Sequence, residues 1–116
     1  MANFEDLDVW KRSSRLCSDI YKYLDNLKDF GFRQQITKAG LSIPSNIAEG
    51  YERDSSKEKA VFLKYAKGSS GEIRTQVFIG MDIGYIDKET GRKWINETKE
   101  LSKMLHSLIR NFKNQS

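Results

Sequence analysis

The chain has 116 residues, of which 38% are hydrophobic and 31% are charged, and its net charge is +4. This length is enough for a single domain with one core across residues 1–116. A single cysteine, Cys17, excludes an internal disulfide, and one cysteine with one histidine is too few for a Cys/His zinc site, so neither a metal nor another cofactor is expected. Because no apolar run approaches the ~20 residues of a membrane span and the acidic N-terminus lacks a signal-peptide core, the sequence predicts a cytoplasmic protein with no membrane partner.

Hydrophobic periodicity predicts four helices, at about residues 7–29, 32–53, 56–83 and 88–113. Apolar side chains recur at intervals of three and four, and no strand-like alternation competes. Gly31 is expected to end the first helix in the left-handed conformation, and Ser55 and Asp87 are expected to cap the third and fourth helices. Four long segments with short links predict an all-α, antiparallel up-down four-helix bundle.

The second predicted helix contains the stretch SIPSNIAEG, residues 42–50, with the only proline of the chain, Pro44. Proline lacks a backbone N–H, and its ring clashes with the carbonyl four residues earlier, here that of Gly40. Because glycine has no side chain, the backbone can bend there at little cost. The sequence therefore predicts a proline-kinked second helix rather than a broken one, with Asn46 bonded to a backbone group near the kink.

Glu49 is the charged residue of this stretch. Lys67 and Arg74 lie one heptad apart on the third predicted helix, close to its core face, and Glu49 is expected to pair with one of them. A buried pair of this kind specifies register more than it adds stability. The alternative, that Glu49 is a general acid or base, lacks a partner nucleophile or a second convergent carboxylate, so no enzymatic activity is predicted.

The second and third predicted helices are apolar on two sides. Beyond one edge of its main apolar face, the second helix carries a second apolar strip of Gly40, Leu41, Pro44, Ala48 and Tyr51. On the third helix the corresponding residues are Val61, Tyr65 and Ile79. A helix that is apolar on two sides needs two partners, and in a small bundle one of them can be another subunit. We hypothesise a homo-oligomer that forms through these two helices.

The segment GSSG, residues 68–71, has the composition of a phosphate-binding loop but not its context. No strand precedes it, and no Gly-Lys-Ser/Thr follows. Within a helix, glycine lowers stability by about 1 kcal/mol relative to alanine. We expect that these small residues are present because they let another helix approach closely. The residues assigned structural or interface roles are Ser42, Pro44, Asn46, Glu49, Gly50, Lys67, Gly68 and Arg74.

The positive charge of the chain is concentrated in its last quarter, where residues 87–116 carry seven basic and four acidic side chains. One side of the fourth helix carries only basic or neutral polar residues, Asn96 and His106 among them. Its cations form the predicted nucleic-acid contact, called here the basic stripe: Lys88, Arg92, Lys99, Lys103, Arg110 and Lys113. Such a stripe can follow a phosphate backbone with salt-sensitive affinity. The alternative is a solvated bundle face, since no aromatic residues are interleaved for base stacking.

Three motifs in the first three helices resemble one protein family. They are VWKRS (residues 9–13), SIPSNIAEG (residues 42–50) and FLKYAKGS (residues 62–69). The family is a bacterial four-helix-bundle family often called 23S rRNA intervening-sequence protein, or ribosomal-protein-like. The resemblance runs from about Leu7 to Ile86, and SIPSNIAEG is highly specific for it. The fourth helix resembles the family only in character.

The resemblance implies a four-helix bundle assembled as a homopentameric barrel, in a family with no established catalytic residues. Some members are encoded within intervening sequences of large-subunit ribosomal RNA genes. The family is also similar to the accessory variability protein of diversity-generating retroelements, a basic pentamer that binds nucleic acid and a reverse transcriptase. The matching motif residues are Asn46, Glu49, Gly50, Gly68 and Ser69, with a basic residue at Lys67. Ser70 stands where the family commonly has leucine, which makes that contact smaller.

These features predict a non-enzymatic, oligomeric protein that binds nucleic acid, RNA more than DNA, through the basic stripe. The alternative is a homo-oligomeric scaffold that binds a protein partner and no nucleic acid. An enzyme is the least supported class, because no acid, base, nucleophile and metal ligands converge.

Overall fold

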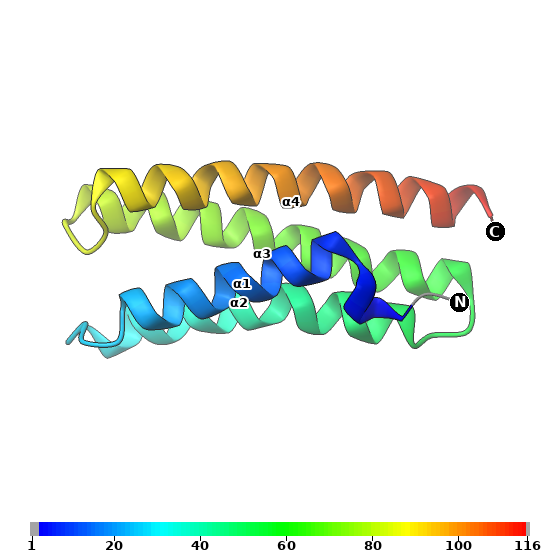
Figure 1. The fold of residues 1–116 in the computed structure, drawn as a ribbon, viewed down its shortest axis with the longest axis horizontal. Helices are drawn as coiled ribbons and strands as arrows, with labels where there is room; N and C mark the ends of the chain where they lie inside the picture. Colours follow the sequence, from blue (N-terminus) through cyan, green and yellow to red (C-terminus); the bar gives the residue numbers. More distant parts are fainter. Residues whose placement is uncertain (1–2, 116) are drawn as a thin grey trace.

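The computed structural model describes residues 3–115, which form an all-α bundle without strands. A short 3₁₀ turn, η1 (Phe4–Asp6), precedes four helices: α1 (Asp8–Tyr23), α2 (Phe30–Tyr51), α3 (Ser56–Asp82) and α4 (Lys88–Asn114). Consecutive helices run in opposite directions along the long axis of a molecule that measures 45 × 21 × 19 Å (Figure 1). The predicted all-α four-helix bundle is confirmed.

Side-chain caps fix where three of the helices begin. Asp29, Ser55 and Asp87 each accept a hydrogen bond from the backbone N–H three residues later, at 3.0, 3.1 and 2.8 Å. The caps at Ser55 and Asp87 are those predicted. The end of the first helix was predicted wrongly: α1 ends at Tyr23 instead of residue 29. Gly31 lies inside α2, because the cap at Asp29 has already started that helix.

The core runs along the bundle axis and draws on all four helices. Ile20, Ile43, Leu63 and Leu105, one from each helix, have no exposed surface. Cys17 is also buried and free, and burial raises the pKa of its thiol. In the described part of the chain, no helix is long and apolar enough to cross a membrane.

The helix α2 continues without a break through Pro44, which is buried. One turn earlier, Gly40 lies against α1, since a Cβ at Gly40 would sit 3.4 Å from Cys17 Sγ. Gly40 and Pro44 of the second apolar strip are buried within the chain, and Tyr51 packs edge-on against Phe112 of α4. Leu41, at 49%, is the only residue of that strip that stays largely exposed. The expectation that this strip faces another subunit is therefore corrected, whereas the kink at Pro44 stays a prediction.

Polar residues of SIPSNIAEG join α2 to α3. Asn46 Nδ2 donates to the backbone carbonyl of Ser42 at 2.8 Å and to Ser42 Oγ at 2.9 Å, which confirms the backbone bond predicted for Asn46. Ser42 Oγ in turn hydrogen-bonds Ser69 Oγ on α3 at 2.7 Å. Two small hydroxyl groups thus link the helices where larger side chains would hold them apart.

The predicted pairing of Glu49 with Lys67 or Arg74 is wrong. Glu49 Oε1 pairs instead with Arg53 Nη2, one turn later on the same helix, at 2.8 Å. Lys67 and Arg74 reach residues of α4, because they lie on the side of α3 that packs against that helix. Glu49 lies on the exposed side of α2 and cannot meet them.

Candidate nucleic-acid interface

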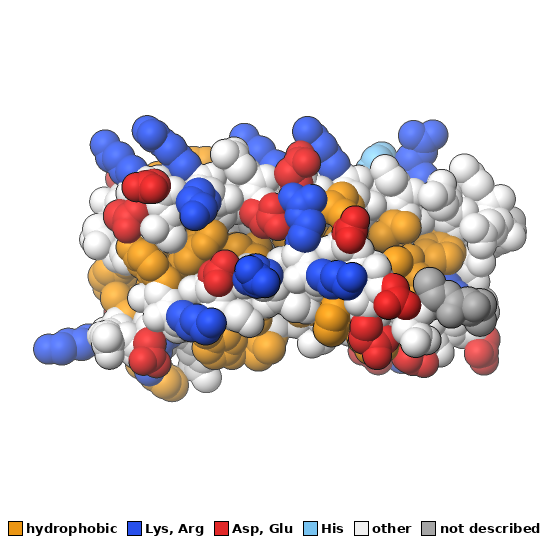
Figure 2. Space-filling model, viewed as in Figure 1, with side chains coloured by type: hydrophobic (Ala, Val, Ile, Leu, Met, Phe, Trp, Pro, Cys, Tyr) orange, Lys and Arg blue, Asp and Glu red, His pale blue; other side chains and the backbone are white. Residues whose placement is uncertain are grey.

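The six residues of the basic stripe are all exposed on α4. Figure 2 shows Lys and Arg side chains in a row along the upper edge of the molecule, the edge that α4 forms in Figure 1. Intervals of three, four and seven residues return to the same side of a helix, so α4 aligns these cations over most of its 27 residues. The opposite side of α4, with Leu101 and Leu105, is buried in the core.

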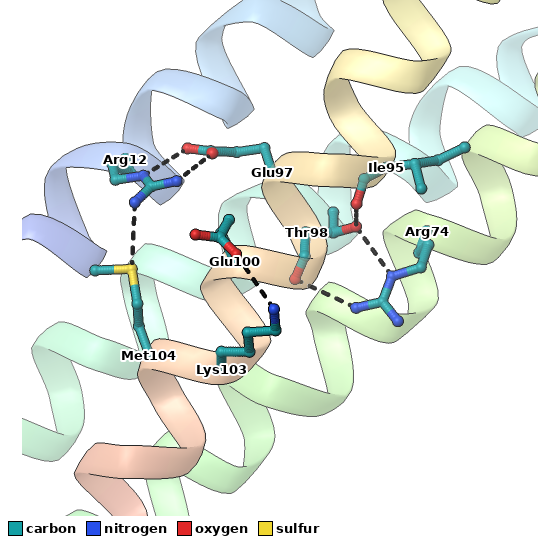
Figure 3. Close-up of polar contacts among 8 residues, drawn as sticks. All are labelled: Arg12, Arg74, Ile95, Glu97, Thr98, Glu100, Lys103 and Met104. Atoms are coloured by element: carbon teal, nitrogen blue, oxygen red, sulfur yellow. Dashed lines mark hydrogen bonds and ion pairs between the residues drawn. The ribbon is translucent and has the colours of Figure 1, made fainter.

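Arg12 of α1 binds one of the acidic residues of α4, Glu97. The carboxylate of Glu97 accepts hydrogen bonds from Arg12 Nε at 2.9 Å and from Arg12 Nη2 at 2.6 Å (Figure 3). The hydrogen bond, and then the charge of Glu97, raise the pKa of Arg12. Because this carboxylate is already paired, it does not offset the charge of the basic stripe.

Lys103 is a stripe residue with a carboxylate partner. Its Nζ lies 3.7 Å from Glu100 Oε2, and the two side chains are 80% and 53% exposed. An ion pair this open to water contributes little, so a phosphate can take the place of the carboxylate. Four other stripe cations form no ion pair with any described residue: Lys88, Arg92, Lys99 and Arg110.

The C-terminal half of the stripe borders a hollow of about 470 Å³ between α3 and α4. The lining of this α3–α4 hollow comprises Lys64, Lys67, Gly68, His106, Ile109, Arg110 and Lys113. Among residues 3–115 this lining includes no carboxylate, and its cations come from both helices. Gly68 leaves the α3 backbone open, since a Cβ there would meet nothing within 4 Å. The hollow is therefore a cationic trough that suits an anionic chain.

Sequence reasoning missed the contribution of Lys64, although a signal for it exists. Lys57, Lys64, Lys67 and Arg74 recur on α3 at intervals of seven, three and seven, which places them on one side of the helix. Two further hollows, of about 500 and 380 Å³, share lining residues with the α3–α4 hollow. Lys57 and Lys64 line one together with Lys113, and Lys67 lines the other together with Lys103.

Like charges meet at one end of the α3–α4 hollow. A hydrogen bond with Lys113 and its positive charge lower the pKa of Lys64, and burial adds to the effect. A neighbouring carboxylate would have favoured the charged lysine instead. The direction of the shift therefore marks the close approach of two positive charges at this end of the hollow.

Arg74 lies beneath the exposed surface and joins α3 to α4. Its guanidinium donates to Thr98 Oγ1 at 3.1 Å and to the Thr98 carbonyl at 3.2 Å (Figure 3). It also donates to Ser102 Oγ at 3.0 Å, and Ser102 Oγ bonds Ser70 Oγ at 2.6 Å. Arg74 thus sets the position of α4 relative to α3 instead of facing a ligand.

A larger hollow, of about 620 Å³, lies between α1 and α4. Its lining mixes Arg15, Lys22 and Lys93 with the acids Asp19 and Glu97. Because both signs of charge are present, this hollow has no preference for a polyanion. Within residues 3–115, no three His, Cys, Asp or Glu side chains are grouped so as to hold a metal ion.

The family model of the 23S rRNA-intervening sequence protein matches residues 5–107. This chain belongs to that family. It is also similar to the crystal structure of a protein of unknown function from the S23 ribosomal protein family of Bacteroides thetaiotaomicron. The two chains share 28% sequence identity and a TM-score of 0.82, over 87% of this chain and 97% of the other. A comparison with curated proteins gives no significant match.

Proposed function

We propose that this member of the 23S rRNA-intervening sequence protein family is a non-enzymatic, homo-oligomeric protein that binds nucleic acid, RNA in particular. Its contact surface comprises the basic stripe of α4 and the lysines that α3 adds beside it. The observation that carries the proposal is the α3–α4 hollow, which gathers cations from two helices and, in the part of the chain that the structure describes, no acid. The family's association with an rRNA intervening sequence favours RNA over DNA.

The test is binding of a fluorescein-labelled single-stranded RNA, measured by anisotropy at several salt concentrations. The variant R92Q/K99Q/K103Q/R110Q is expected to bind at least about tenfold more weakly, with a salt slope smaller by about three, since each phosphate contact on a single strand contributes about 0.7. The matched control, K11Q/K22Q/K28Q/K38Q, also removes four exposed cations, but from α1, α2 and their connection. Equal losses in both variants would show that net charge, and not the stripe, determines binding.

Exposed apolar side chains on α3 support the homo-oligomer. Val61, Tyr65 and Ile79 are 37%, 57% and 48% exposed, and Phe78 and Ile83 lie exposed near the end of the same helix. Unpaired apolar surface of this kind is typical of a protein interface. Five subunits are the number that the family resemblance implies, and a cytoplasmic location stays a prediction.

The same α3 surface favours the second candidate function, a scaffold that binds a protein partner and no nucleic acid. Affinity purification after nuclease treatment separates the two. A partner that stays bound without nucleic acid, together with no anisotropy change for RNA at low salt, would replace the first proposal with the second.

A further inference from the structure

The hollow between α1 and α4, called here the α1–α4 hollow, has the volume and lining of a small-molecule site. Its volume of about 620 Å³ falls within the range of roughly 300–1,000 Å³ that is typical of ligand pockets. Leu16 and Trp94 line it as buried residues, 3% and 6% exposed. Arg15, Asp19 and Lys93 line it as exposed residues. Charged groups therefore surround a largely apolar floor, which is how many pockets bind and orient a ligand.

Two aromatic rings of this lining are held in place. Trp94 and Tyr23 pack edge to face, with ring centroids 5.3 Å apart. The Tyr23 hydroxyl donates to Asp87 Oδ2 and accepts a hydrogen bond from the Asp87 backbone N–H, each at 2.9 Å. Because the pair is fixed before any ligand arrives, a planar ring can bind against it with little further loss of side-chain freedom.

The indole of Trp94 carries a hydrogen-bond donor that residues 3–115 leave unused. No described acceptor bonds its Nε1, and this nitrogen is not sealed from solvent. Since the rest of the side chain is almost fully buried and Trp94 lines the α1–α4 hollow, the donor is available on that side. A buried tryptophan N–H usually has a partner, and an acceptor on a ligand in the hollow would supply one.

The charged residues of the lining favour a ligand with one anionic group. Arg12 already binds the carboxylate of Glu97 through two hydrogen bonds, so Glu97 does not offset Arg15 or Lys93. Neither of these two cations forms an ion pair with a described residue. Arg15 belongs to α1 and Lys93 to α4, so a phosphate in the hollow can be bound by both helices. Asp19 opposes a chain of phosphates but accepts hydrogen bonds from hydroxyl or amino groups.

We propose that the α1–α4 hollow binds a nucleoside monophosphate, either free or as one unit of an RNA strand. The base lies against Trp94 and Tyr23 and accepts the indole hydrogen bond. The phosphate binds Arg15 and Lys93, and a ribose hydroxyl donates to Asp19. A phosphate ion alone would leave the aromatic rings uncovered, and an uncharged ring would leave the two cations unpaired. This site is separate from the basic stripe, so the inference goes beyond the proposed function and does not depend on it.

The test measures binding of adenosine monophosphate (AMP) to a W10F variant, in which Trp94 is the only remaining tryptophan. AMP is expected to change the fluorescence of Trp94 as it binds. Titration calorimetry at constant salt then compares AMP with adenosine and with inorganic phosphate. AMP is expected to bind at least about tenfold more tightly than either, because its base and its phosphate contact different parts of the lining.

Two variants separate the contacts, each measured by calorimetry. R15Q/K93Q is expected to lose about tenfold in affinity for AMP and to bind adenosine as wild type does. W94F keeps an aromatic ring without the N–H and is expected to bind both ligands about fivefold more weakly, the value of one net hydrogen bond. Circular dichroism checks that W94F is folded, and R15Q/K93Q tests the site without changing the core. The matched control K11Q/K28Q also removes two exposed cations, outside the hollow, and should keep the affinity for AMP.

A short oligo(A) distinguishes the two sources of the nucleotide. If the unit belongs to an RNA strand, W94F is expected to weaken oligo(A) binding about fivefold, and excess AMP should compete with the strand. If the hollow binds free nucleotides, oligo(A) should bind W94F and wild type equally, and AMP should bind alongside it. Both results require the site proposed here.

The inference and the proposed function fail in different ways. If AMP bound no more tightly than inorganic phosphate, or bound equally to wild type, W94F and R15Q/K93Q, the nucleotide site would be wrong and the proposed function would stand. If RNA failed to bind in the anisotropy test while AMP still bound, the proposed function would be wrong and this site would stand.

Discussion

Two glycines of the family motifs occupy opposite environments. A Cβ at Gly50 would sit 3.0 Å from Phe62 Cβ and 3.2 Å from the carbonyl oxygen of Lys59, whereas one at Gly68 would meet nothing within 4 Å. We predict that Gly50→Ala lowers the free energy of unfolding by about 1–3 kcal/mol, because Phe62 and the α3 backbone must move. Gly68→Ala is expected to raise it by about 1 kcal/mol, the difference in helix propensity.

Urea unfolding followed by circular dichroism measures both glycine variants under the same conditions. Each variant serves as the control for the other, since both change glycine to alanine within a helix. Stabilisation of both would mean that α3 moves away from Gly50 at no cost. Destabilisation by Gly68→Ala would mean that the exposed side of α3 is covered in solution.

Single residues also show where sequence reasoning succeeds. The bond of Asn46 to the Ser42 carbonyl was predictable, because both residues lie one turn apart on one helix. The partner of Glu49 was not predictable from periodicity. Periodicity shows which side of each helix is apolar, but not how far two helices rotate about their axes when they pack. That rotation directs Lys67 and Arg74 toward α4 and leaves Glu49 with Arg53.

At the scale of helices, two aspartate caps are held by tyrosines from elsewhere in the chain. The hydroxyl of Tyr85 donates to Asp29 at 2.8 Å, and that of Tyr23 donates to Asp87 at 2.9 Å. A backbone N–H of the following helix and then the tyrosine hydroxyl lower the pKa of each carboxyl. A carboxyl whose pKa is lowered by folding stabilises the fold above its ordinary value of ~3.9, and this stability is lost as the pH falls through the lowered value.

We predict that D29N/D87N reduces the loss of thermal stability below about pH 4. Asparagine still caps a helix but does not titrate, so the midpoint temperature should fall less between pH 7 and pH 3 than in wild type. The control D19N/D54N removes two exposed carboxylates that form no hydrogen bond with the described residues and should follow wild type. An equal fall in all three proteins would mean that other carboxylates determine acid unfolding.

The pair of Arg12 and Glu97 links α1 to α4, which lie on either side of the larger hollow. We predict that Glu97→Gln costs up to about 1 kcal/mol, because it removes the charge from a bidentate pair at the surface. Hydrogen exchange is expected to quicken in α1 more than in α3. The control Glu100→Gln breaks the longer and more exposed contact with Lys103 and should leave α1 exchange unchanged. Uniform quickening after Glu97→Gln would mean that α1 does not open separately.

The arrangement of helices was predictable, because four amphipathic segments with short links have few ways to bury their apolar sides. The α3–α4 hollow was harder to predict, since it joins Lys64 and Lys67 of one helix to His106 and Arg110 of another. The basic stripe follows from one helix alone and needed no packing information. Sites built by two helices depend on their register, which the 3.6-residue period does not determine.

For the whole molecule, the exposed side of α3 and the basic stripe together predict that assembly strengthens RNA binding. Tyr65 and Ile79 are largely exposed, so Y65S/I79S should leave each subunit folded but separate the subunits. Light scattering is expected to give about five times the subunit mass for wild type and the mass of one subunit for the variant. The control Tyr21→Ser changes an exposed tyrosine of α1 and should keep the assembly.

The separated subunit is then expected to bind a long RNA at least about 100-fold more weakly than the assembly, although its stripe is unchanged. Once one RNA is bound to the stripe of one subunit, the stripes of the other subunits are held nearby at a high effective concentration. A single subunit lacks these linked sites. Anisotropy with RNAs of increasing length measures this gain, because a strand that spans only one stripe should bind both proteins equally. If light scattering gave the mass of one subunit for wild type, the proposed oligomer would be wrong. Equal affinity of assembly and subunit for long RNA would show that each stripe acts alone.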